Sequence, residues 1–137
     1  MKSIFPDSML STSTGESLSL EGIASKLTFF HEQIHLIHWQ TSSYAEHMCT
    51  GELYDGVHDF KDSVIEKLMG YTGRKPRAPK MIQINDNVAA TSVVNDLKNF
   101  AQELKTFAET NNYLDIGNMA DELSGKAAKA LYLLTLS

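Results

Sequence analysis

The nine-residue segment HEQIHLIHW, which begins at His31, holds three of the five histidines in the chain. Its first half matches H-E-x-x-H, the pattern in which two imidazoles on one helix face bind zinc in metalloproteases. A protease also needs a third ligand and a substrate cleft, and the extended pattern requires Gly and His where His38 and Thr41 stand. We therefore set the protease interpretation aside and take the second half, His38-Trp39, as the informative half.

Two pairs of possible metal ligands stand out. His38 ends one predicted helix and His47 opens the next across a short turn, so one ion could contact both imidazoles. Asp62 and Glu66 are spaced i, i+4 and share a helix face. At ~1.5 Å of rise per residue, His47 and Asp62 lie about 22 Å apart along one helix. Ligands of one ion lie only about 2.0–2.2 Å from it. Each pair is therefore half a site, and two chains must meet, for instance antiparallel across a two-fold axis, to complete one.

Four apolar stripes at helical spacing predict the helices that position these residues. The first helix ends near Gln40, and Ser43 begins an S-x-x-E capping box that opens the second, which ends by Gly73. The third is broken at Asn111-Asn112, and Asn112 with Asp115 is expected to cap the fourth. The stripes consist of Ile23, Leu27, Phe30, Ile34 and Ile37; Leu53, Val57, Phe60, Val64 and Leu68; Val93, Leu97, Phe100, Leu104 and Phe107; and Ile116, Met119, Leu123, Ala127, Leu131 and Leu134.

The order of these elements predicts the fold class. A tight turn joins the first two helices and a long proline-containing connection joins the second and third, which predicts an all-α, ferritin-like four-helix bundle with a crossover. The segment 81–84 is the one short strand candidate. Residues 1–18 are rich in Ser and Thr without a period, so we expect a flexible N-terminal tail followed by the bundle over 19–137.

The composition restricts the cellular compartments and the partners that fit this sequence. The formal net charge of −5 does not attract nucleic acid, and Cys49, the single cysteine, excludes an intramolecular disulfide. No apolar run has the length of a membrane span, and the N-terminus lacks a continuous apolar secretory segment. We therefore expect a cytoplasmic protein with no membrane partner. Cys49 is interpreted as a packed small hydrophobe.

One basic cluster lies in the connection between the second and third helices. It could hold nucleic acid or another anion, but the interleaved prolines and the acidic remainder of the chain favour an ordinary exposed loop. The cluster consists of Arg74, Lys75, Arg77 and Lys80.

The order of motifs resembles the Dps-type mini-ferritins. The motifs are His38-Trp39, His47, the run Glu52-Leu53-Tyr54-Asp55, and Asp62-x-x-x-Glu66. The resemblance covers about residues 20–70 well and is weaker at 129–134, KALYLL. It implies a hollow dodecamer of ferritin-like bundles that oxidises Fe(II) with peroxide or oxygen and stores the ferric product. It further implies a ferroxidase centre across the dimer interface of the first two helices, with iron held by His38 and His47 of one subunit and by Asp62 and Glu66 of the other.

The sequence also departs from that family pattern. The gap between His38 and His47 is shorter than usual, and the acid expected one turn after His47 is Gly51. This leaves a second interpretation open: a non-catalytic ferritin-like scaffold or binding protein with a degenerate metal site, for instance phage-encoded. DNA stays an open partner, but not through the tail, which carries only Lys2 as a basic residue. Glu32-x-x-His35 resembles half of an intrasubunit di-iron motif, whose second copy the chain lacks.

Overall fold

A computed structural model describes residues 18–137 as four helices. The helices are α1 (Leu20–Gln40), α2 (Tyr44–Thr72), α3 (Ala90–Thr110) and α4 (Leu114–Leu134). Within 18–137 there is no strand, so the segment 81–84 is irregular and the predicted all-α four-helix class is confirmed. The predicted flexible tail lies, apart from its last residue, outside the described residues. None of the four helices is long and apolar enough to cross a membrane.

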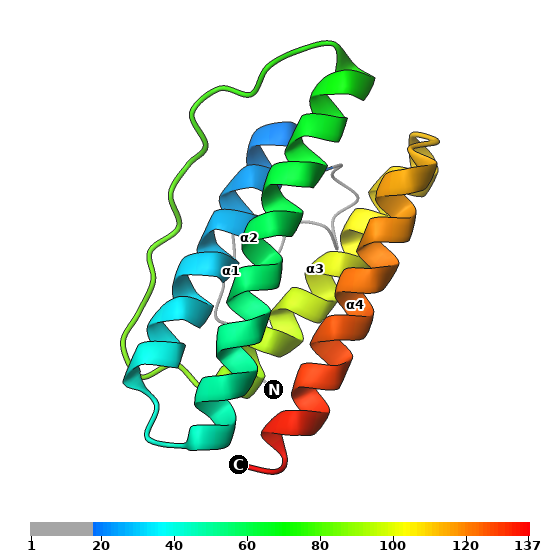
Figure 1. Ribbon diagram of the computed structural model, residues 1–137. Coiled ribbons are helices and arrows are strands. Elements are labelled where there is room, and N and C mark those ends of the chain that lie inside the picture. The colour runs from blue at the N-terminus through cyan, green and yellow to red at the C-terminus, as the bar shows by residue number, and fades with distance from the viewer. Residues whose placement is uncertain (1–17) are drawn as a thin grey trace.

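The helices form two antiparallel hairpins, α1 with α2 and α3 with α4 (Figure 1). The connection between α2 and α3 runs along the outside of α1 from one end of the molecule to the other, so α3 begins near the end where α1 turns into α2 (Figure 1). As a result α2 and α3 point in the same direction, and α4 lies beside α2.

The ends of α2 follow the chemistry of the sequence. The Ser43 hydroxyl accepts a hydrogen bond from the backbone N–H of Glu46 at 3.2 Å, as the capping box predicts. At the other end Gly73 adopts φ 71°, a left-handed conformation that glycine reaches without strain, and its N–H donates to the Met69 carbonyl. These two caps fix where the hairpin turn and the long connection start.

The predicted cap of α4 is wrong. Asn112 lies one residue too early, with φ 60° in the turn, and Tyr113 occupies the N-cap position without a side-chain hydrogen bond. The Asp115 carboxylate instead accepts hydrogen bonds from the Tyr71 hydroxyl and from Lys67 Nζ, the latter at 2.9 Å. The tertiary contact to α2 therefore replaces the local cap that the spacing suggested.

The predicted apolar stripes form the core. Phe30 of α1 and Phe100 of α3 are almost fully buried, and their ring centroids lie 5.8 Å apart, which joins the two hairpins. The stripe residues that are only partly buried still pack against this core. They are Phe60, Phe107, Met119 and Leu131.

Side chains of α1 hold the long connection in place. Gln33 is fully buried, and its amide donates to the Asn85 carbonyl at 3.0 Å and accepts from the Asn85 N–H at 2.9 Å. Gln40, the last residue of α1, makes a similar pair of hydrogen bonds. Its amide donates to the Asp86 carboxylate at 2.9 Å and accepts from the backbone N–H of Asn87 at 3.2 Å. An irregular segment can follow a helix closely only when its backbone polar groups find such partners.

Substituting Gln33→Ala should destabilise the fold by about 2 kcal/mol, because the backbone N–H and C=O of Asn85 both lose their partner, the buried amide of Gln33. Gln83→Ala is the matched control, since Gln83 is an exposed glutamine of the same connection. Urea unfolding followed by circular dichroism measures both free energies. Equal free energies of unfolding for the two variants would show that the connection does not depend on Gln33.

The third anchor of the connection is ionic. The two terminal guanidinium nitrogens of Arg74 donate to the Glu21 carboxylate at 2.8 Å, and the backbone N–H of Arg77 donates to it at 2.9 Å. These hydrogen bonds lower the pKa of Glu21 from 4.5 to about 2, and those from Arg74 have the largest effect. Because Arg74 already pairs with Glu21, the contact favours the ordinary-loop interpretation of the basic cluster.

The lowered pKa of Glu21 gives a pH dependence with a definite sign. The folded-state pKa lies below the unfolded value, so this anchor contributes stability above about pH 4.5 and loses it as the pH falls toward 2. We expect Glu21→Gln to remove part of the acid destabilisation between these values. Thermal melting points of the two proteins should then converge from pH 5 down to pH 2 (roughly the window of the shift). Parallel curves would contradict the anchor.

Candidate metal centre

The structure brings His38 and His47 into direct contact across the turn between α1 and α2. His38 Nδ1 lies 2.7 Å from the His47 carbonyl oxygen, and His47 Nδ1 lies 2.9 Å from the His38 carbonyl oxygen. The two rings stack with centroids 3.8 Å apart and planes 16° apart. Each histidine therefore holds the ring of the other through its own backbone.

These hydrogen bonds determine which nitrogen of each ring carries the proton. A carbonyl oxygen only accepts, so Nδ1 must be the donor in both His38 and His47, and Nε2 of each neutral ring keeps its lone pair. Within residues 18–137 neither Nε2 makes a hydrogen bond. A metal-binding histidine characteristically has one nitrogen hydrogen-bonded and the other free. Each ring is therefore fixed by the backbone of the other histidine and keeps one nitrogen, Nε2, that could bind an ion.

Gly51 is part of this arrangement. A Cβ built on Gly51 would lie 2.8 Å from Cε1 and 3.1 Å from Nδ1 of His38, closer than carbon atoms approach without displacement. The glycine thus makes room for the His38 ring where the family resemblance led us to expect a carboxylate. The family pattern indicates at Gly51 only a missing ligand. The position of Gly51 one turn after His47 was the available signal that this residue faces the histidine pair.

Asp62 and Glu66 lie further along α2. Both are exposed and line one surface hollow together with His58. No group of three or more His, Cys, Asp or Glu side chains among residues 18–137 is arranged to hold a metal ion. Within one chain His38 therefore lies beside His47, and Asp62 lies near Glu66. The histidine pair and the carboxylate pair are not in contact with each other.

A row of rings continues from the His38–His47 pair along the α1–α2 face. The ring of Tyr54 stacks on that of His35 with centroids 4.0 Å apart, and its centroid lies 5.4 Å from that of His38. The ring of Trp39 also contacts His35, with centroids 4.0 Å apart. Burial lowers the pKa of His35 most, and the neighbouring imidazole of His31 lowers it further. His35 is therefore neutral near pH 7, and its ring is held between two aromatic neighbours.

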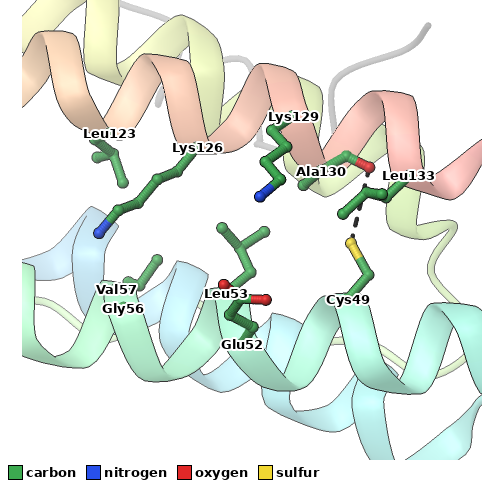
Figure 2. A pocket seen from close by; sticks show the side chains of 10 residues that line it. All are labelled: Cys49, Glu52, Leu53, Gly56, Val57, Leu123, Lys126, Lys129, Ala130 and Leu133. Carbon is green, nitrogen blue, oxygen red and sulfur yellow. Dashed lines mark hydrogen bonds between the residues drawn. The ribbon is translucent and has the colours of Figure 1, made fainter.

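Another concave feature lies between α2 and α4. It is a groove of about 220 Å³, and Figure 2 shows Lys126 and Lys129 extending from α4 toward α2 across it. At one end the buried Cys49 thiol donates to the Ala130 carbonyl at 3.8 Å, and burial raises the pKa of that thiol. The protonated, packed thiol fits the interpretation of Cys49 as a small hydrophobe.

These observations define an all-α four-helix protein with a prearranged histidine pair at one end of its first hairpin. The model of the family of unknown function DUF5856 matches residues 38–134, from His38 of the pair to the last residue of α4, which is more than half of the chain. The chain belongs to that family. No curated protein and no solved structure matches it.

Proposed function

We propose that the protein is a Dps-like iron-binding mini-ferritin, which oxidises Fe(II) at a centre between two subunits and stores or detoxifies the ferric product. The observation that carries the proposal is the reciprocal hydrogen bonding of His38 and His47, which leaves Nε2 of both rings free for an ion.

The second half of the proposed site is the carboxylate pair. Imidazole and carboxylate donors together suit Fe(II) and Fe(III), the substrate and product of the proposed reaction. His38 and His47 would bind an iron ion together with Asp62 and Glu66 of the partner subunit, because the same chain cannot bring the two pairs together. Two antiparallel copies of α2 would form two such centres, one at each end of the pairing.

Exposed apolar side chains beside the histidine pair support a partner chain. Trp39, Tyr44 and Met48 are 66%, 78% and 54% exposed around the α1–α2 turn. Exposed apolar side chains that cluster in one place are a feature of interaction surfaces. We propose that this face forms a dimer and that the dimers assemble into a hollow dodecamer in the cytoplasm, with any DNA contact made outside the tail.

Oxidation of Fe(II) tests the proposal. Anaerobic addition of Fe(II) followed by oxygen or peroxide should give a saturable rise in ferric absorbance in the full chain. The His47→Ala variant should lose this step. Glu46→Gln should retain it, because Glu46 is one residue away and outside the proposed ligand set, and glutamine serves the capping box as glutamate does. Light scattering after size exclusion reports the assembly separately. Identical, non-saturable oxidation by all three proteins would overturn the proposal.

The alternative function is a non-catalytic scaffold or binding protein. Its specific support is Gly51, since the missing carboxylate leaves each subunit with fewer iron ligands than the family pattern. An assembled oligomer that binds no Fe(II) would establish this alternative.

A further inference from the structure

The first half of the HEQIHLIHW segment has no role in the proposed iron centre, yet it lies against another histidine. The ring of His31 in α1 has its centroid 5.2 Å from that of His58 in α2 and 5.8 Å from that of His35. His31 is mostly buried, with 16% of its side chain exposed, whereas His58 is exposed. Two imidazoles from different helices therefore meet on the outer face of the hairpin.

The separation of these two rings is the one that a shared ion requires. A zinc ion lies about 2.0–2.1 Å from each ligating nitrogen, which places it roughly 3.2 Å from each ring centroid. Two rings at a tetrahedral angle around one ion then have centroids about 5 Å apart. The observed 5.2 Å between the ring centroids of His31 and His58 matches this separation.

The neighbouring carboxylate prepares His31 as a ligand. Glu32 Oε1 lies 2.9 Å from His31 Nδ1, and an ionised carboxylate can only accept, so Nδ1 carries the proton and Nε2 keeps the lone pair. A carboxylate that holds a histidine in this way orients the ring and raises its basicity as a ligand. Glu32 thereby serves His31, which leaves the H-E-x-x-H pattern without the general base that a protease needs.

We propose that His31 and His58 form a two-imidazole clamp for a divalent ion of the zinc class, which ties α1 to α2, with water completing the coordination. Nitrogen donors without a carboxylate ligand favour Zn²⁺, Cu²⁺ or Ni²⁺ over Fe²⁺. His35 is not a ligand, because its ring is held between Trp39 and Tyr54, each 4.0 Å away. His58 lines the same hollow as Asp62 and Glu66, but the clamp uses neither carboxylate and does not depend on the proposed iron centre.

Zinc titration tests the clamp, and Zn²⁺ is redox-inert, so the readout does not depend on iron oxidation. The full chain carrying His47→Ala serves as the background, since it removes one histidine of the proposed iron centre. In that background Zn²⁺ should bind and raise the melting temperature, as any ligand specific to the folded state does. Adding His31→Phe or His58→Phe should weaken zinc binding at least about tenfold and abolish the thermal shift.

His35→Phe is the matched control, because it removes a histidine from the same row and keeps an aromatic ring between Trp39 and Tyr54. It should bind Zn²⁺ like the background. Circular dichroism confirms the fold of each variant, and His58, being exposed, tolerates the change most readily. Unchanged zinc affinity in His58→Phe would overturn the clamp, as would an equal loss in His35→Phe. A wild-type protein that binds zinc but does not oxidise Fe(II) would overturn the proposed function and would leave the clamp unaffected.

Discussion

Substituting Gly51→Ala should weaken Fe(II) binding by about 10–100-fold, the range measured when support of a metal-binding histidine is lost. The added methyl group would lie 2.8 Å from Cε1 of His38, so the ring must turn away. Turning breaks the 2.7 Å hydrogen bond to the His47 carbonyl and the stacking of the two rings. The stability of the fold should hardly change, because the displaced atoms belong to the end of a side chain.

Gly70→Ala is the matched control for this prediction. Gly70 lies in the same helix with open space where a Cβ would be added, so the substitution should leave Fe(II) binding intact and stabilise α2 slightly. Calorimetric titration with Fe(II) under anaerobic conditions measures both variants. Equal Fe(II) affinity in Gly51→Ala and the wild type would show that the His38 geometry is irrelevant to iron.

Gly51→Asp separates the structural argument from the family resemblance. The resemblance suggests that an acid at this position would restore a missing ligand and strengthen iron binding. The structure leads to the opposite expectation, because the Cβ of any residue at this position meets the His38 ring before its carboxylate reaches an ion. Tighter Fe(II) binding in Gly51→Asp would favour the family pattern over the observed geometry.

The sequence could predict the features of this protein that depend on local spacing. Apolar periodicity located the four helices, and the Ser43 capping box placed the turn that sets His38 beside His47. The same kind of reasoning failed at Asn112, where a local cap pattern competes with hydrogen bonds from Tyr71 and Lys67 to Asp115. A local pattern carries no information about a partner more than forty residues away.

The features that could not be predicted all depend on tertiary contacts. Nothing near Gln33 in the sequence shows that its amide pairs with the backbone of Asn85, because the path of the connection is set by the assembled helices. The reciprocal carbonyl contacts of the histidine pair likewise require the exact crossing of two helix ends. The contact of His31 with His58 needs the relative register of α1 and α2, which neither stripe determines alone.

Mixing two inactive variants should restore iron oxidation if the centre is built by two subunits. His47→Ala removes a ligand from the histidine half and Asp62→Ala removes one from the carboxylate half, so each variant alone should be inactive. In a mixed dimer, the intact histidines of the Asp62→Ala chain meet the intact carboxylates of the His47→Ala chain. One of its two centres is then complete, and the other has lost both ligands.

Random pairing of equal amounts of the two chains makes half of the dimers mixed, so the co-expressed sample should regain about a quarter of the wild-type oxidation capacity. The control is the double variant His47→Ala/Asp62→Ala co-expressed with the wild type, which has the same number of substitutions. Its mixed dimers contain no complete centre, so about a quarter of the capacity should remain here too, from wild-type dimers alone. The informative difference is therefore between the mixed single variants and either single variant measured alone. A sample that stays inactive on mixing would show that the histidines and the carboxylates never belong to one centre, because His47 and Asp62 of one α2 lie too far apart to share an ion.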